Sequence, residues 1–275
     1  MGERNQRANL LDAFDSQLRG PSAHLTSPGA RVEVEGQLVR ALMAEGGGMV
    51  AASGLTSLES SQTHSLVRSQ VELFSKLRQR FEWKTWSHDH PESFYKTLLD
   101  FGFTKGAEET VMVGSTERVA SHHVALPPGA TLRQLRPGPD FRMLEDQLGL
   151  AFGEDHRGHA LGCESAVQAL PDHVSVHGVE MAGRLVASGR LELVEGTDFG
   201  TLWGGSVVPR WRHQGLYRAL VAERARLAEE RGFPLLEVDA LATSRPILER
   251  LGLVAVCTTT GYLWDPVTSP PLAKG

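Results

Sequence analysis

The stretch Val207-Val208-Pro209-Arg210-Trp211-Arg212-His213-Gln214-Gly215-Leu216-Tyr217-Arg218-Ala219-Leu220 joins a strand-like apolar run to a helix-like segment. The apolar run covers residues 201–208 and stops at Pro209, which lacks the N–H group that a sheet ladder needs. A short basic turn follows, and a helix is predicted to begin at or just after Gly215. The first N–H groups of a helix have no internal partner and lie at the positive end of its dipole. The stretch therefore predicts an anion cradle that suits a pyrophosphate.

Within this stretch, Arg212, Gly215 and Tyr217 resemble the acyl-CoA-binding turn of the GNAT superfamily of N-acetyltransferases. That family has Arg/Gln-x-x-Gly-x-Gly/Ala between its fourth strand and third helix, and Tyr217 departs from the small last residue. The alternative is an ordinary strand-to-helix turn with arginines at the surface. The strand before the turn, the helix after it and the end of the chain favour the resemblance.

The end of the chain has the pattern strand, loop, short helix, strand. Residues 233–239 predict a strand, residues 246–251 a short helix that stops at Gly252, and residues 254–264 a final strand. This order resembles the closing portion of a GNAT domain, in which a strand precedes a helix that ends in Leu-Gly-Phe.

Residues 82–113 have the same pattern as residues 233–264, which indicates an internal repeat. Gly102 aligns with Gly252, and Asp89 with Asp239, at a constant offset of 150 residues. Chance similarity between two strand–helix–strand units is the alternative. Together with the repeat, the resemblance implies the α/β (α+β) class, with two GNAT-like domains that each have a mixed, mostly antiparallel sheet flanked by helices.

The two halves differ where a cofactor would bind. Arg212-His213-Gln214-Gly215 aligns with Gln62-Thr63-His64-Ser65, so the first half lacks both the arginine and the glycine of the cradle. We therefore expect a degenerate GNAT-like domain over residues 1–120 and a GNAT N-acetyltransferase domain over residues 121–275, with one acyl-CoA site per chain.

The other elements follow from apolar periodicity and turn residues. Residues 5–20 and 139–152 predict helices, and a link is expected over residues 114–129. Strands are predicted over residues 31–39, 48–55, 131–135, 174–181, 184–193 and 201–208.

Composition indicates a globular protein, because 41% of the 275 residues are hydrophobic and 22% are charged. The net charge of −5 argues against nucleic-acid and membrane-surface binding. Cys163 and Cys257 show no metal-ligand spacing, so we expect no metal and a reducing, cytoplasmic environment. No signal peptide and no apolar run of membrane-spanning length is expected.

The resemblance implies acetyl-CoA as the co-substrate and assigns residues to it. The pantetheine arm would bind the end of the strand before the cradle, the pyrophosphate would bind the turn, and Ser244 would lie near the arm or near the attacking nitrogen. Ser244 equally suits a helix N-cap, since it lies two residues before Pro246. The residues implied are Ser206, Val207, Val208, Arg212, His213, Gln214, Gly215, Leu216, Tyr217, Arg218 and Ser244.

Direct acyl transfer needs a base for the amine, polarisation of the thioester carbonyl and an acid for the leaving thiolate. The strand-end N–H of Val207 or Val208 is the candidate for polarising the carbonyl. The candidate bases are Glu192, Glu237 and Asp239, and each could instead be a solvated or ion-paired carboxylate.

Leu248 occupies the position at which many GNAT proteins carry the acidic tyrosine, and its hydrocarbon side chain cannot donate a proton. Tyr262 or Cys257 on the final strand, water, or the substrate ammonium could serve instead. Tyr217 is a further candidate. The domain could also bind acyl-CoA without efficient catalysis.

The expected activity is transfer of an acetyl group from acetyl-CoA to the amine of a small molecule. Glu154 and Asp155, in the loop that walls the acceptor pocket of GNAT proteins, would favour a cationic amine. The alternatives are a non-catalytic acyl-CoA-binding sensor or interaction module, and a protein or peptide N-acetyltransferase. A homodimer is a possible assembly.

Overall fold

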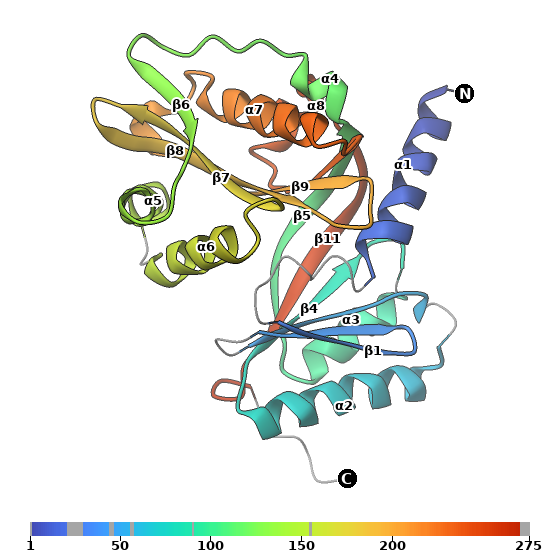
Figure 1. Cartoon of the computed structure of the whole chain (residues 1–275). Helices are drawn as coiled ribbons and strands as arrows, with labels where there is room; N and C mark the ends of the chain where they lie inside the picture. Colours follow the sequence, from blue (N-terminus) through green and yellow to red (C-terminus); the bar gives the residue numbers. More distant parts are fainter. Residues whose placement is uncertain are drawn as a thin grey trace.

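The computed structural model describes residues 2–20, 30–43, 47–55, 58–89, 91–153 and 156–269. The described part contains two α/β halves that share one sheet (Figure 1). The first half has α1 (Gly2–Leu18), β1 (Arg31–Glu35), β2 (Leu38–Leu42), β3 (Gly48–Ala52), α2 (Ser60–Leu77), β4 (Phe81–Trp86), α3 (Glu92–Asp100) and β5 (Thr104–Ser115).

The second half begins with a short helix in the segment expected to be a link. Its elements are α4 (Thr116–Ala120), β6 (Ala130–Gln134), α5 (Pro139–Phe152), α6 (Arg157–Ala169), β7 (Val174–Met181), β8 (Arg184–Leu193), β9 (Phe199–Val207), the 3₁₀ turn η3 (Pro209–Trp211), α7 (Leu216–Glu230), β10 (Leu235–Ala240), α8 (Arg245–Leu251) and β11 (Val254–Trp264).

Each half places its last strand against the other half. The sheet has the order β1-β2-β3-β4-β11-β5-β10-β9-β8-β7-β6, so β11 pairs with β4, and β5 pairs with β10. Both of these pairings are antiparallel, and β5 and β11 also pair with each other. The two long strands run side by side through the waist of the molecule (Figure 1). The two sheets expected from the sequence are therefore one continuous sheet.

The internal repeat is visible in the order of the elements. The series α2, β4, α3, β5 matches the series α7, β10, α8, β11. Gly102 follows α3 with φ +82°, and Gly252 follows α8 with φ +101°. Glycine adopts this left-handed conformation at no steric cost, which is why it ends both helices.

One predicted strand is wrong. Residues 31–39, predicted as one strand, contain β1, a turn at Gly36 and Gln37, and the start of β2, which pairs antiparallel with β1. Gly36 has φ +60°, a conformation that the alternating pattern of apolar residues around it does not reveal.

Helices cover both faces of the second half's sheet. On β10, Leu236, Val238 and Ala240 are buried in an apolar cluster with residues of α7 and α8. Side chains alternate along a strand, so Glu237 and Asp239 face the opposite side of the sheet. Helices α5 and α6 pack on that side against β7 and β8, and α1 packs there against β5 and β11. None of the described helices combines the length and apolar character needed to cross a membrane.

Candidate active site

The strands β9 and β10 are parallel, but they remain paired over only three residues each. Their ladder joins residues 199–201 to residues 235–237 and then stops. Beyond it, β9 continues to Val207 along β8, and β10 continues to Ala240 along β5. We call the wedge between residues 202–207 and 238–240 the splay. In the part of the chain that the structure describes, no strand lies across from the backbone groups on its inner edges.

A β-bulge turns the end of β9. Gly204 and Gly205 together lie opposite Gly189 of β8, because the register shifts between Ser188 and Arg190. Gly204 has φ +58°, which glycine tolerates best. A Cβ atom on Gly205 would lie only 2.6 Å from the ring of Tyr217. The glycines therefore allow both the bend and the close approach of this ring.

A buried arginine holds the bulge in place. The guanidinium of Arg224, on α7, donates to the carbonyl oxygens of Arg190 and Trp203, where the ladder is interrupted. It also lies 2.7 Å from the position of a Cβ atom on Gly189, so a side chain there would displace it. Burial lowers the pKa of Arg224 to about 10, well above neutrality, so the side chain keeps its charge.

The turn after β9 has the geometry of an anion cradle. His213 has φ +66° and Gly215 has φ +82°, and α7 begins directly afterwards without a side-chain cap. Within the described chain, the six consecutive N–H groups of residues 213–218 have no hydrogen-bond acceptor, and the first bonded one is that of Ala219. Their number and the helix N-terminus suit a bound diphosphate.

Three residues expected to contact the co-substrate are already engaged in hydrogen bonds within the protein. The N–H group of Val208 donates to the carbonyl oxygen of Val186, so it is not available to polarise a thioester. The guanidinium of Arg212 donates to the carbonyl oxygen of Val207 at 3.1 Å and thereby ties the turn to the end of β9. Ser206 is buried and accepts a hydrogen bond from Gln147 of α5.

Tyr217 and Ser244 meet at the splay. The Tyr217 ring packs on Gly205, and Ser244 provides a hydrogen-bonding neighbour for its hydroxyl group. Burial raises the pKa of Tyr217 above its usual value, so the phenol is protonated at neutral pH. Ser244 takes the N-cap position of α8 but makes no capping bond, and its hydroxyl donates to the carbonyl of Leu241. Leu248 is fully buried in the apolar cluster beneath α7 and α8.

The three candidate bases lie on one face of the sheet at the base of the splay. Glu192 of β8 lies opposite Thr201 of β9, which lies opposite Glu237 of β10. Asp239 lies two residues further along β10 and shares the face with Glu237. The sequence predicted this common orientation for the two β10 residues, and the register adds Glu192.

Their surroundings differ. Burial, followed by the neighbouring Asp239, raises the pKa of Glu237 well above its usual value, and Lys84 opposes this effect. Glu192 lies 2.9 Å from the Nε atom of Arg190 in an ion pair. The raised pKa of Glu237 makes it the better candidate for taking up the proton of an amine, whereas Glu192 is held in its ion pair with Arg190.

Tyr262 does not reach the splay, because β11 leaves the second half and runs along β4. It pairs with Trp83, and its ring stacks on Tyr95 with 6.0 Å between centroids, in the aromatic core of the first half. Cys257 lies nearer, since it pairs with Val111, the partner of Asp239. Burial raises the pKa of the Cys257 thiol to about 12.

Glu154 and Asp155, expected to favour a cationic amine, lie outside the described residues. Among the described residues, no group of three His, Cys, Asp or Glu side chains could hold a metal ion.

Two residues of the site, Arg224 and Lys84, were not predicted from the sequence. No local motif marks either residue, since Arg224 occupies an ordinary helical position and Lys84 an ordinary strand position.

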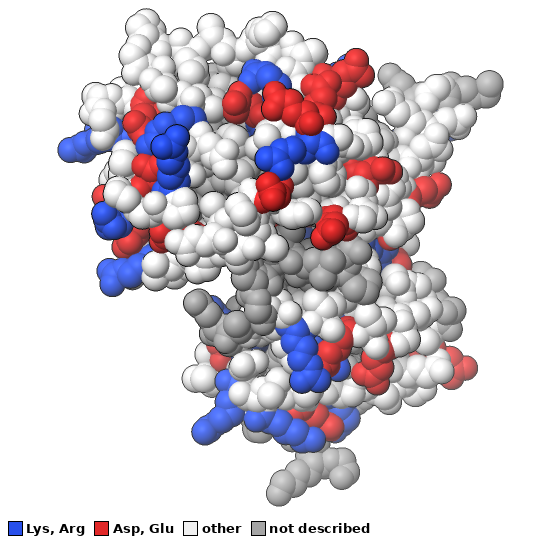
Figure 2. All heavy atoms as spheres, viewed as in Figure 1, with Lys and Arg blue, Asp and Glu red and all other residues white. Residues whose placement is uncertain are grey.

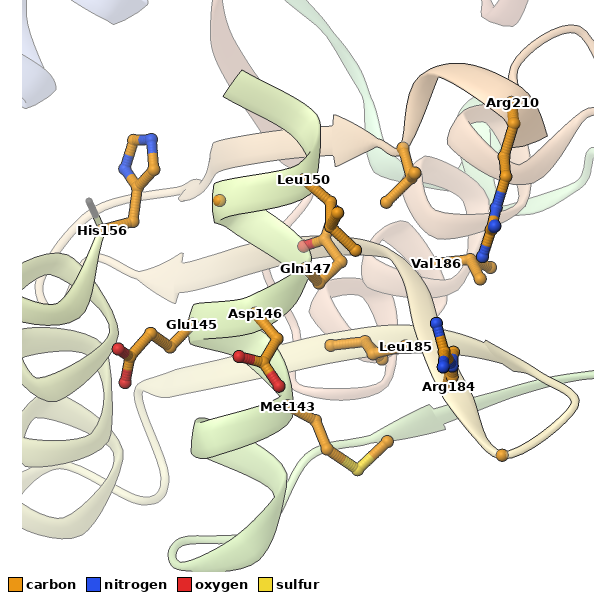
Figure 3. A pocket seen from close by; sticks show the side chains of 13 residues that line it. Met143, Glu145, Asp146, Gln147, Leu150, His156, Arg184, Leu185, Val186 and Arg210 are labelled. Carbon is orange, nitrogen blue, oxygen red and sulfur yellow. The ribbon is translucent and has the colours of Figure 1, made fainter. Parts of the chain in front are cut away.

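A cavity of about 610 Å³ lies next to the site, between α5 and the β7–β8 hairpin. Figure 3 shows Arg184 and Arg210 across this cavity from Glu145 and Asp146 of α5. Val208 also lines it, whereas none of the three candidate bases does. The cavity therefore adjoins the end of β9 and is separate from the splay.

Charges on the surface are mixed. On the face shown in Figure 2, Lys and Arg side chains are interspersed with Asp and Glu side chains over both halves. No extended basic surface is visible on this face outside the residues drawn in grey.

No protein-family model and no curated protein matches the sequence. Solved structures match the fold over nearly the whole chain. A GCN5-related N-acetyltransferase from Kribbella flavida has a TM-score of 0.65 at 17% identity, and the match covers 95% of each chain. A tandem GNAT protein from the clavulanic acid biosynthesis pathway also has a TM-score of 0.65, at 13% identity, covering 98% of this chain and 95% of that one.

A third structure, the GCN5-related N-acetyltransferase from Sphaerobacter thermophilus, has a TM-score of 0.59 at 14% identity and covers 86% of this chain and 78% of that one. The chain therefore has the fold of the GCN5-related N-acetyltransferases, in the tandem arrangement that its internal repeat predicted.

Proposed function

We propose that the protein is an acyl-CoA-dependent N-acyltransferase that transfers an acetyl group from acetyl-CoA to the amine of a small molecule. The observation that carries this proposal is the cradle of six unpartnered N–H groups at residues 213–218, directly beside the splay. A ligand with a diphosphate and a narrow arm fits these two features together. When bound, acetyl-CoA supplies an activated thioester.

In this proposal, the turn before α7 binds the diphosphate, and the bulge holds the end of β9 away from β10. Glu237 acts as the base, because its raised pKa brings proton uptake towards neutral pH. Tyr217 is proposed as the acid in place of the family's tyrosine, because its hydroxyl lies at the splay and remains protonated. The polarising donor proposed at the end of β9 is the N–H group of Val207, since that of Val208 is engaged.

The first half is proposed to support the site without binding a second acyl-CoA. At Gln62–Ser65, the position equivalent to the cradle, the chain is already inside α2 (Ser60–Leu77), so no turn is present there. The domain boundary near residue 120, the acidic contribution of Glu154 and Asp155, the cytoplasmic location and a homodimer remain predictions.

A screen of amines tests the proposal. Purified protein with acetyl-CoA is offered amino acids, polyamines, other small amines and peptides, and the released thiol is measured. Turnover with a small amine is the expected result. Turnover with peptides alone would favour a peptide N-acetyltransferase. Saturable acetyl-CoA binding without turnover on any amine would favour the non-catalytic acyl-CoA module, which the buried Leu248 supports.

A further inference from the structure

The first half sends a lysine side chain to the candidate active site. Lys84, on β4, donates a hydrogen bond from its Nζ atom to Asp239 Oδ2 on β10. The side chains of the two residues are 17% and 11% exposed, respectively. In the sheet, β11 and β5 lie between these two strands. The ion pair therefore crosses the seam at which the halves exchange strands.

The surroundings of Lys84 are acidic and aromatic. Its Nζ atom lies 5.7 Å from the centre of the Trp203 ring, which follows the paired part of β9. Burial alone would lower the pKa of Lys84, but Asp239, followed by Glu237 and Glu82, outweighs it and raises the pKa. The lysine is therefore a permanent cation at this site.

The carboxyl groups facing this cation come from three strands. Glu82 lies on β4, Glu109 on β5, and Glu237 and Asp239 on β10. Burial, then Asp239, raises the pKa of Glu109. Two neighbouring buried carboxylates repel each other, so the second one loses its proton only with a counter-charge nearby. Among the groups acting on Glu237, Lys84 is the cation that supplies this counter-charge.

We propose that Lys84 is a positioning residue of the active site: it holds Asp239 in an ion pair, and its charge allows Glu237 to release its proton and act as the base. This inference rests on the proposed function, and it makes the first half part of the catalytic apparatus although residues 62–65, its equivalent of the cradle, lie inside α2. Lys84 acts through Asp239 and Glu237 and needs no contact with the substrate.

The test begins with the free protein, so it does not depend on activity. The side-chain carboxyl carbons of Glu and Asp are labelled with ¹³C, and their NMR signals are followed during a pH titration. In Lys84→Gln, which keeps a hydrogen-bond donor without the charge, the proton affinity of the pair of Asp239 and Glu237 should rise about tenfold or more. Lys84→Arg should restore the wild-type titration.

Lys96→Gln is the matched control, because it neutralises an exposed lysine paired with Asp100 on α3. It should leave the titration of the pair unchanged. The same shift should appear in the acidic limb of kcat/KM, which moves to higher pH in Lys84→Gln, while the Kd for acetyl-CoA stays at the wild-type value.

An unchanged titration of the pair in Lys84→Gln would overturn the inference. Should that variant fail to fold, Lys84→Met, which keeps the length of the side chain without its charge, replaces it, and an unchanged titration of the pair in Lys84→Met would overturn the inference equally. A shifted titration in a protein that transfers acyl groups to no amine would instead contradict the proposed function.

Discussion

At the scale of single residues, the candidate site depends on backbone conformations that few side chains tolerate. Gly215 has φ +82°, and a Cβ atom there would lie 3.4 Å from Val124 and 3.6 Å from the Arg218 guanidinium. A larger side chain would enter the space in front of the unpartnered N–H groups. In the bulge, Gly204 permits the positive φ, and Gly205 leaves room for the Tyr217 ring.

Gly215→Val should abolish acetyl-CoA binding, because the side chain fills the cradle. Acetyl-CoA at about 100 times its Kd should add about 2.7 kcal/mol to the stability of the wild type and nothing to this variant. Thermal unfolding with and without acetyl-CoA measures the difference. Gly196→Val is the control, since Gly196 has φ +76° with no atom near its Cβ position, so it carries a similar backbone strain away from the site. An undiminished ligand shift in Gly215→Val would refute the cradle.

Tyr217→Phe tests the proposed acid. The variant keeps the ring on Gly205 and loses only the hydroxyl group, so kcat should fall about 100-fold, while the Kd for acetyl-CoA changes little. Steady-state kinetics and calorimetry check the two quantities. Unchanged kcat would show that another group protonates the leaving thiolate. Tyr262→Phe is the matched control and should have wild-type kcat, because Tyr262 lies in the core of the first half.

Local signals account for what the sequence predicted about these residues. The strand, the proline, the basic turn and the glycine are consecutive, so their geometry follows from neighbouring residues. Lys84 and Asp239 are 155 positions apart, and nothing near either residue indicates the other. Arg224 is comparable, because an arginine in a helix is normally solvated, and the carbonyl oxygens at the bulge, distant in sequence, are acceptors that the helix pattern does not reveal.

At the scale of elements, the splay results from a parallel pair that ends early. Apolar periodicity predicted most strands and helices, because it follows directly from one buried face. It did not predict where β9 and β10 separate, which depends on the bulge and on α7 packing beneath it. The hairpin of β1 and β2 was missed for a similar reason, since Gly36 interrupts an otherwise continuous alternation.

Strand β7 carries a buried histidine that makes the stability of the second half depend on pH. His177 is 4% exposed and lies 3.1 Å from the hydroxyl oxygen of Ser175. Burial, then the charge of Arg224, lowers its pKa to about 4 from 6.5. The unfolded chain therefore binds a proton first as the pH falls, and stability decreases between about pH 6.5 and pH 4.

His177→Gln should remove this part of the acid sensitivity. In the wild type, His177 should lower the free energy of unfolding by an amount on the order of 3 kcal/mol as the pH falls from about 6.5 to about 4. Urea unfolding of both proteins at pH 7 and pH 4.5 measures it, and the difference between the two pH values should be smaller in the variant. Equal pH dependence in both proteins would show that His177 has the same pKa in the folded and the unfolded chain.

At the scale of the whole molecule, the exchange of β5 and β11 joins the two halves into one folding unit. Each strand pairs with the other and with the opposite half, so neither half can keep its sheet complete alone. The sequence cannot reveal this exchange. Each strand would need the same pattern of apolar residues whether it paired within its own half or across the seam. The repeat predicted two domains, and the pairing predicts that they unfold together.

Differential scanning calorimetry should show one cooperative transition for the full chain, because loss of either half removes a strand from the other. The calorimetric and van't Hoff enthalpies should agree. Two resolved transitions would mean that the halves are independent in spite of the shared strands.

The central claim is that the chain binds one acyl-CoA, in the second half. Isothermal titration calorimetry with acetyl-CoA tests it most directly. The account predicts saturable binding with a stoichiometry of one per chain, retained in Ser65→Ala, which alters the equivalent position of the first half, and lost in Gly215→Val. Absence of binding to the wild type, or two sites per chain, would contradict it.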